Sequence, residues 1–221
     1  DLGNAEQNMI GVATGISREN FSVITTTFAP FQTTRCCEQI KVNLGYMKEK
    51  ITMVGLASGL ILGNLGFTHC CIEDIGILRS IPNISIISPS DSLETIKAVE
   101  QALKYNQSCY IRITGGSNNP IINQIDYHFE IGKSITLKKG KDISIISCGS
   151  ILNECLKAAH ELEKKNISTE VVNMHTIKPL DEKKILSILE SSKLLVSVEE
   201  HNIIGGLGSA ISEVISSSKQ K

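Results

Sequence analysis

The sequence predicts an α/β protein of two consecutive α/β/α layered domains, each built on a mostly parallel sheet. Strand-like and helix-like segments alternate along the 221 residues, a pattern that is typical of parallel sheets flanked by helices. The chain contains 33 isoleucines and only 4% aromatic residues, so its burial depends on β-branched side chains that suit central strands. A cluster of Gly, Ser, Asn and Pro at 114–124 interrupts the alternation, and it predicts a domain boundary near residue 125.

The first domain, residues 1–125, is expected to hold four strands. Small apolar residues at 8–15 indicate a short buried helix that ends at a glycine. Apolar positions one turn apart indicate an amphipathic helix over 32–44. Ser90 or Asp91 can cap a helix that runs to about residue 105, with Glu94 placed to complete a capping box. A further helix is expected at 73–79, and strands are expected at 21–28, 51–57, 84–88 and 108–113.

The second domain, residues 126–221, continues the alternation with three strands in a small sheet. A helix begins after Asp181, which can serve as its cap. The chain opens on Asp1 rather than on methionine, and we expect it to be a processed product or a fragment. Strands are expected at 143–148, 169–174 and 194–199, and helices at 152–165, 181–189 and from 209 onward.

Charge, hydropathy and cysteine usage exclude several classes of protein. The 22 basic and 23 acidic residues give a net charge of -1, so nucleic-acid binding by phosphate neutralisation is not expected. Neither an apolar run of the ~18 residues that a membrane span needs nor a signal segment is present in the sequence, so no membrane association is expected. The seven cysteines form no C-x-x-C pair and are interpreted as small buried residues of a cytoplasmic, reducing compartment. The alternative is one reactive thiol, Cys36 beside Arg35.

Four residues at the ends of predicted segments could carry chemistry. Glu6, at a loop-to-helix junction, is either an acid favoured by the helix dipole or a buried carboxylate whose raised pKa lets it exchange a proton with a ligand. Phe28 and Phe31 follow a strand and are either core residues of the turn or a stacking surface for a flat ring. His69 ends a glycine-rich loop and is either a hydrogen-bonded structural residue or a group that shuttles protons or binds a hydroxyl.

A glycine motif, GGLG at 205–208, follows Glu199, Glu200 and His201 between a strand and a helix. It resembles half of a dinucleotide-binding fingerprint, but the full G-x-G-x-x-G is missing. The alternative interpretation is a tight turn that lets the helix pack on the strand.

Taken in order, four blocks of this sequence resemble those of transketolase-like thiamine diphosphate enzymes. The resemblance covers essentially the whole chain. It implies a pyrimidine-binding domain that lacks its N-terminal part, followed by a transketolase C-terminal domain that lacks its C-terminal end. The blocks are NAEQNMIGVATG, TFAPFQTTR, GFTHCCIEDIGILRSIPNISIISPSD and VEEHNIIGGLGSAISEV.

The resemblance implies ketol transfer, in which thiamine diphosphate carries a two-carbon unit from a ketose donor to an aldose acceptor. Glu6 would hydrogen-bond the aminopyrimidine ring of the cofactor, Phe28 and Phe31 would pack against that ring, and His69 would join Glu6 as a catalytic residue. The family binds Mg²⁺ through a diphosphate-binding domain that this chain lacks. A diphosphate-binding subunit or domain is therefore the implied partner, in a homodimer or heterotetramer with the active site between chains.

Some positions depart from the family pattern. Thr34 stands where a third aromatic residue is usual, and Ala57, Leu65 and Gly115 stand where transketolases carry a His, an Asp and an Arg for the sugar phosphate. We therefore expect a small, non-standard sugar substrate, for instance one used in polysaccharide sugar synthesis. One alternative is a deoxyxylulose phosphate synthase or the β-subunit of a 2-oxo acid dehydrogenase. Another is a non-catalytic dimerisation or scaffold subunit.

Overall fold

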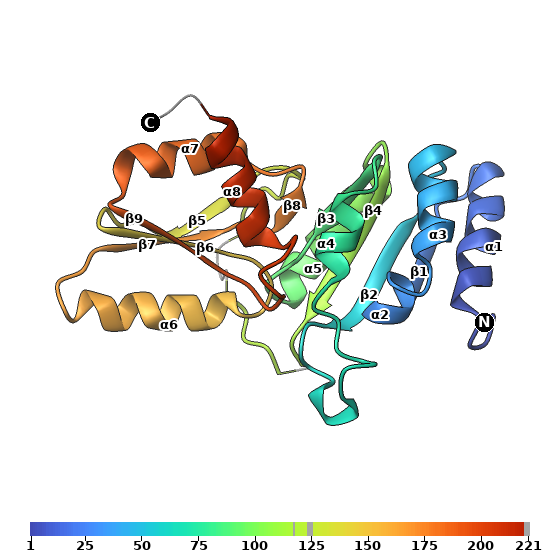
Figure 1. Cartoon of the computed structure of the whole chain (residues 1–221), viewed down its shortest axis with the longest axis horizontal. Coiled ribbons are helices and arrows are strands. Elements are labelled where there is room, and N and C mark those ends of the chain that lie inside the picture. The colour runs from blue at the N-terminus through green and yellow to red at the C-terminus, as the bar shows by residue number, and fades with distance from the viewer. Residues whose placement is uncertain (117, 123–125, 219–221) are drawn as a thin grey trace.

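The computed structural model describes residues 1–116, 118–122 and 126–218, and it shows two α/β parts side by side (Figure 1). The first part is built on a five-stranded sheet and the second on a four-stranded sheet. The predicted α/β class with mostly parallel sheets is therefore confirmed. The predicted domain boundary at residue 125 lies outside the described residues.

The sheet of the first part has the strand order β1-β2-β4-β3-β8. Its first four strands are parallel, and all four residues of β3 are buried. The fifth strand, β8, comes from the second half of the chain and pairs antiparallel with β3. The sequence analysis missed β8, because three residues give too short a pattern to read. The strands are β1 (Ile24–Phe28), β2 (Thr52–Ser58), β3 (Ile84–Ile87), β4 (Ser108–Thr114) and β8 (Thr176–Lys178).

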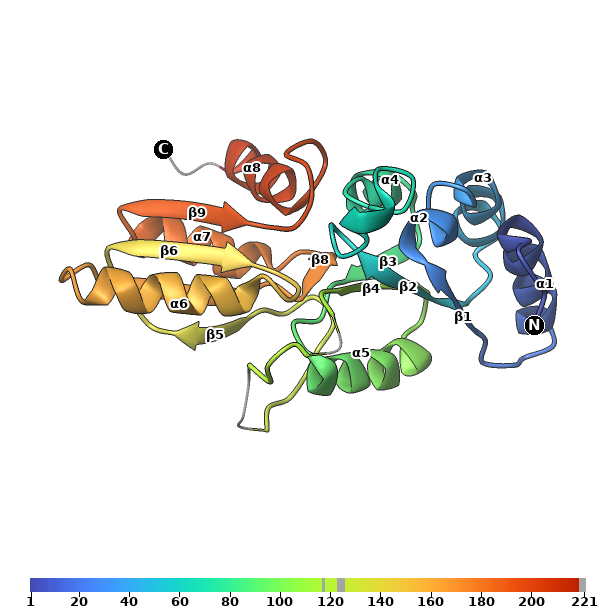
Figure 2. The ribbon, with the colours of Figure 1, turned by 90° about the horizontal axis from the view of Figure 1, so that it is seen from below.

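Helices lie on both faces of this sheet. α2 (Ala29–Gln32), α3 (Cys37–Ile40) and α4 (Asp74–Arg79) lie on one face, and α5 (Ser92–Lys104) lies on the other (Figure 2). α1 (Glu6–Arg18) packs beside β1. The helix expected at 8–15 is therefore longer than predicted and does not end at a glycine. Only one of its faces is buried within this chain: Ile10 and Ala13 are buried, whereas Val12 and Ile16 are exposed.

The prediction of a single helix over 32–44 is wrong. The chain there passes through the end of α2, then α3 and a π-helical turn, η1 (Lys41–Tyr46). Its apolar spacing was read correctly, since Cys36, Ile40 and Leu44 are all fully buried. The interruption falls at two adjacent threonines. The hydroxyl of Thr33 donates to the carbonyl of Ala29 at 2.7 Å, and such local bonds compete with helix continuation.

The cap of α5 agrees with the prediction from the sequence, except that one hydrogen bond of the capping box is shifted by one residue. Asp91 Oδ1 accepts a bond from the amide of Glu94 at 2.8 Å, so Asp91 is the cap. The Glu94 carboxylate reaches the amide of Ser90 at 2.6 Å, one residue before the cap. The capping box therefore closes one position earlier than its usual form.

The second sheet has the order β5-β7-β6-β9, with α6 on one face and α7 and α8 on the other (Figure 1). The sheet has four strands where three were expected, because β5 pairs antiparallel with β7 at its edge. Asp181 caps α7, as predicted, by accepting a bond from the amide of Lys184. The elements are β5 (Ile135–Lys138), β6 (Ile143–Ser147), α6 (Leu152–Glu163), β7 (Thr169–Asn173), α7 (Glu182–Ser191), β9 (Leu194–Val198) and α8 (Leu207–Ser217).

The two parts share one hydrophobic core. Ile86 and Tyr110 of the first sheet belong to the same buried cluster as Met174 and Leu207 of the second part. Among the described residues, no helix combines the length and the hydropathy that crossing a membrane would need.

Candidate active site

The candidate site lies at the edge of the first sheet where β1, β2 and β4 end. A long connection between β2 and α4, which we call the His69 loop (residues 59–72), leaves this edge and projects beyond it, as the teal segment of Figure 1 shows. It contains one short 3-10 turn, η2 (Gly63–Leu65). Because carboxyl ends of parallel strands meet at one edge, residues far apart in sequence come together here.

Glu6 is the first residue of α1, at the helix end that favours a negative charge. Glu6 is buried, with 8% of the residue exposed to solvent. Nη1 of Arg35 donates to Glu6 Oε2 at 2.6 Å. Burial raises the pKa of Glu6, but the hydrogen bond and positive charge of Arg35, together with a backbone hydrogen bond, lower that pKa below its ordinary value.

Of the two interpretations of Glu6, the acid at the start of a helix agrees with its place in α1, whereas the raised pKa is contradicted in the free chain. The sequence analysis associated Arg35 with Cys36 and did not place its cation beside the carboxylate, which lies 29 residues away in the chain. The cation of Arg35 favours the ionised form of this carboxylate.

Three rings form an aromatic cluster beside this ion pair. The ring centroids of Phe31 and His69 are 5.3 Å apart, those of Phe28 and Phe31 are 6.2 Å apart, and those of Phe28 and His69 are 6.4 Å apart, all in edge-on arrangements. Phe28 is 39% exposed and Phe31 is half-buried. Neither is a core residue, so their side chains are available to a ligand. His69 Nδ1 is 3.0 Å from the hydroxyl of Thr68.

Arg35 joins the carboxylate to the rings. Its guanidinium carbon lies 4.0 Å from the centroid of Phe31 while Nη1 is bonded to Glu6. The structure thus brings Glu6, Phe28, Phe31 and His69 together, and Arg35 is the member that the sequence analysis missed. The signal that could have found it is the i, i+4 spacing of Phe31 and Arg35, which brings two side chains together on a helical turn.

The cysteines are free thiols without a disulfide, as expected. The alternative of a reactive Cys36 is contradicted. Burial and the charge of Glu6 raise the pKa of Cys36 to about 12, and Arg35 offsets this only in part. Five cysteines are buried, namely Cys36, Cys71, Cys109, Cys148 and Cys155, and Cys37 and Cys70 are half-buried.

A cavity of about 400 Å³ lies at the same sheet edge, beyond the ends of β2 and β4. Ala57 and Gly115, two of the positions that depart from the family pattern, both line it, while Leu65 lies on the His69 loop outside its lining. Ala57 has φ 51°, a left-handed conformation that is strained for a residue with a side chain. Of the described residues, those lining the cavity include no Lys, Arg or His; its polar members are Ser90, Asp91, Ser92, Thr95, Thr114 and Asn119.

The GGLG motif is a tight turn. Glu199 accepts bonds from the amides of Leu207 and Gly208 at 2.6 and 2.9 Å, so its carboxylate occupies the start of α8. Gly205 lies so close to α4 that an added Cβ would be 2.8 Å from Gly76 Cα. The dinucleotide interpretation is contradicted, because a carboxylate already fills the position of a phosphate.

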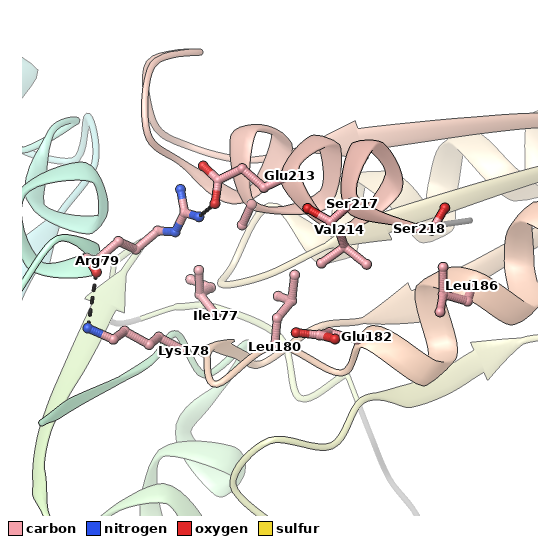
Figure 3. A pocket seen from close by; sticks show the side chains of 11 residues that line it. Arg79, Ile177, Lys178, Leu180, Glu182, Leu186, Glu213, Val214, Ser217 and Ser218 are labelled. Carbon is pink, nitrogen blue, oxygen red and sulfur yellow. Dashed lines mark hydrogen bonds and ion pairs between the residues drawn. The ribbon is translucent and has the colours of Figure 1, made fainter. Parts of the chain in front are cut away.

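A second groove lies apart from this site. This groove, of about 490 Å³, lies between β8, α7 and α8, where Arg79 pairs with Glu213 (Figure 3). It shares no lining residue with the aromatic cluster. Within residues 1–116, 118–122 and 126–218, no group of three His, Cys, Asp or Glu side chains could hold a metal ion.

Comparison with known families matches the chain in two segments. The sequence model described as "Transketolase, pyrimidine binding domain" matches residues 1–118, and that described as "Transketolase, C-terminal domain" matches residues 132–220.

Individual proteins similar to this chain are also transketolases. The chain is 38% identical over 215 residues to a subunit of apulose-4-phosphate transketolase from Actinobacillus succinogenes, covering 97% of this chain and 69% of that protein. It is 36% identical to 6-deoxy-6-sulfo-D-fructose transketolase subunit SqwH of Clostridium sp., covering 97% of this chain and 66% of that protein. A solved structure described as a split gene transketolase, inactive beta4 tetramer, superposes with a TM-score of 0.90 at 35% identity, covering 98% of this chain and 70% of that one.

Proposed function

The chain belongs to the transketolase family, and on this premise we propose that it supplies the pyrimidine-binding side of a thiamine diphosphate-dependent ketol transferase. The enzyme would move a two-carbon unit from a ketose donor to an aldose acceptor. The observation that carries this proposal is the cluster of Glu6, Phe28, Phe31 and His69, which gathers one carboxylate and three rings from separate segments.

The donor set of the cluster fits an aminopyrimidine ring. A carboxylate can hydrogen-bond the ring, and Phe28 and Phe31 offer hydrocarbon faces to a flat heterocycle. When bound, thiamine diphosphate supplies an electron-accepting thiazolium ring. Mg²⁺ and the diphosphate would be held by the partner half.

Arg35 and Glu6 would control the proton at the ring. In the free chain Arg35 keeps the carboxylate ionised. A ligand ring that displaces Arg35 from Glu6 Oε2 removes the main influence that lowers the pKa, and burial then raises that pKa. The carboxyl group can then hold a proton at a ring nitrogen. His69, half-buried against Phe31, would transfer protons on the substrate side.

A partner is part of the proposal, because the chain spans about two thirds of the length of its two relatives described above. Those relatives are named as transketolase subunits, and the split-gene protein is described as inactive as a β4 tetramer. We propose a diphosphate-binding subunit or domain as the partner, in a homodimer or heterotetramer. Exposed Val12 and Ile16 on α1, and Phe67 on the His69 loop, offer apolar surface for it. The free cysteines support a cytoplasmic location.

The cavity beside the cluster would receive the distal end of a small sugar. Ala57 and Gly115 give it space, and Ser90, Thr114 and Asn119 give it polar atoms. A phosphate is normally held by cations or by clustered amides. We therefore propose a substrate that ordinary ketose phosphates do not mimic well, and we expect them to compete weakly in a kinetic assay. Tight competition by these ketose phosphates would contradict this.

The test compares the wild type with Glu6→Gln in the complete protein together with its diphosphate-binding half, with thiamine diphosphate and Mg²⁺ added. Loss of an essential proton-transfer group lowers turnover by about 10²–10⁴-fold. We expect such a loss in Glu6→Gln with the fold retained. Glu38→Gln, the same chemical change on an exposed surface of α3, serves as the control and should leave turnover unchanged.

The outcomes separate the alternatives. Near-normal turnover in Glu6→Gln would refute the role of this carboxylate. Decarboxylation of a 2-oxo acid in place of two-carbon transfer would favour a dehydrogenase-type subunit. Failure of the complete protein to bind thiamine diphosphate would favour the scaffold alternative.

A further inference from the structure

The segment 200–202, which follows β9 in the second part of the molecule, lies against both ends of the His69 loop. We propose that Glu200 and Asn202 are positioning residues, through which the second domain fixes this loop and thereby the ring of His69 against Phe31. The inference rests on the role proposed for His69 above, and it gives Glu200 of the Glu-Glu-His motif a function that the tight turn of GGLG does not explain.

The entry of the loop is held by Glu200. Its Oε1 accepts a hydrogen bond from the amide of Leu60 at 2.6 Å. Gly59 has φ 77°, and a Cβ added there would overlap the same carboxylate. A glycine is needed at this position both for the left-handed backbone and for the close approach of Glu200.

The exit of the loop is held by Asn202. Its backbone amide and its side-chain Nδ2 both donate to the carbonyl of Ile72, at 3.0 and 2.6 Å. The two ends also bond to each other, because the amides of Gly59 and Cys71 each donate to the carbonyl of the other at 2.8 and 2.9 Å. Entry and exit therefore form one closed base.

Arg112 ties this base to the second domain. Its Nη2 donates to the carbonyl of Cys71 at 3.2 Å and to the carbonyl of Glu200 at 2.8 Å. Its Nε donates to both carboxylate oxygens of Asp74, at 3.0 and 2.8 Å. The side chains of Arg112 and Asp74 are 1% and 0% exposed, so this support is fully desolvated.

The tip of the loop lacks comparable support in the described residues. Leu65 is 50% exposed and Phe67 is 84% exposed. The ring of His69 contacts Phe31 and Phe28 edge-on, an arrangement of modest strength. Its placement therefore depends on the base, and a displacement of about 1 Å at a reacting group can lower a rate about 10²-fold.

Hydrogen exchange in the complete protein tests the contact itself. Glu200→Ala removes the acceptor of the Leu60 amide, whereas Glu200→Gln keeps a side-chain oxygen there. We expect amides of residues 60–71 to exchange about tenfold faster in Glu200→Ala and near the wild-type rate in Glu200→Gln. Glu213→Ala breaks the Arg79–Glu213 pair, a contact between the same two parts that does not touch the loop (Figure 3), and should leave these amides unchanged.

Turnover then tests the positioning. We expect about a ten- to hundred-fold loss of kcat in Glu200→Ala, with recovery in Glu200→Gln. In a His69→Ala background, Glu200→Ala should cause no further loss, because its effect passes through that ring.

Two outcomes would overturn the inference: unchanged exchange of the loop in Glu200→Ala, or losses from Glu200→Ala and His69→Ala that multiply. Faster loop exchange together with full turnover in His69→Ala would instead support the hold on the loop and refute the role proposed for His69.

Discussion

The buried pair Arg112–Asp74 permits a prediction whose magnitude follows from its contacts. Replacing Arg112 with methionine keeps a long apolar stem but removes the guanidinium. Asp74 then keeps the hydroxyl of Tyr110, at 2.8 Å, as a hydrogen-bond donor but loses the guanidinium, and the imidazole of His201 lies 3.8 Å away. The carbonyls of Cys71 and Glu200 lose a donor as well.

Together, these lost contacts amount to a large fraction of the free energy of unfolding of a protein. Removing one partner of a buried ion pair destabilises by about 3–5 kcal/mol, because an uncompensated charge remains. The total free energy of unfolding of a protein is usually about 5–15 kcal/mol. We therefore expect Arg112→Met to lower the free energy of unfolding by about 4 kcal/mol. Asp74→Asn should have a comparable effect, since it leaves the guanidinium buried without its anion.

Urea unfolding followed by far-ultraviolet circular dichroism suits this chain, which contains no tryptophan. The double variant Asp74→Asn/Arg112→Met buries neither charge, so the two single losses should exceed the double loss by about 2 kcal/mol or more. The same cycle on Arg79 and Glu213, whose side chains are 16% and 65% exposed, should give about 1 kcal/mol or less. Equal coupling in the two cycles would refute the reasoning.

Two further predictions concern protonation. Arg35→Met should raise the pKa of Glu6, because burial, the largest influence, remains when the cation is removed; a ¹³C carboxyl titration by NMR measures this, and an unchanged titration would contradict it. Burial also lowers the pKa of His175, although the charges of Glu94 and Asp181 oppose this. As the pH falls, His175 is therefore protonated in the unfolded chain before it is protonated in the folded one. The contribution of His175 to the free energy of unfolding is complete above about pH 6.5 and is lost as the pH falls below that value. Unfolding free energies of His175→Phe from pH 7 to pH 5 should show a shallower decline than the wild type, and parallel declines would count against it.

Much of the fold could be predicted because its strands are short apolar segments with clear turn signals between them. β3 is an example: four β-branched and small residues are closed by a proline, and all four are buried. The strands β5 and β8 could not be predicted in the same way. Each is an antiparallel edge strand of four residues or fewer, and its pairing depends on a partner strand that is distant in the sequence.

The candidate site shows the same division. Glu6, Phe28, Phe31 and His69 could be selected because each stands at a predicted segment end or in a matching block, and the structure places them together. The pKa of Glu6 could not be predicted, because it depends on which way the Arg35 side chain points. Local sequence sets segment ends, whereas electrostatics depends on contacts made across the fold.

The strand β8 has a consequence for how the chain could be divided. It pairs with the outer edge of β3, and its residue Ile177 packs in the core that the two parts share. A fragment that stopped near residue 125 would expose the backbone amides and carbonyls of β3, an isoleucine-rich edge that invites pairing with other chains. Because a strand from the second half completes the sheet of the first, we expect the separated halves to fold poorly and β3 to be shielded from pairing with other chains.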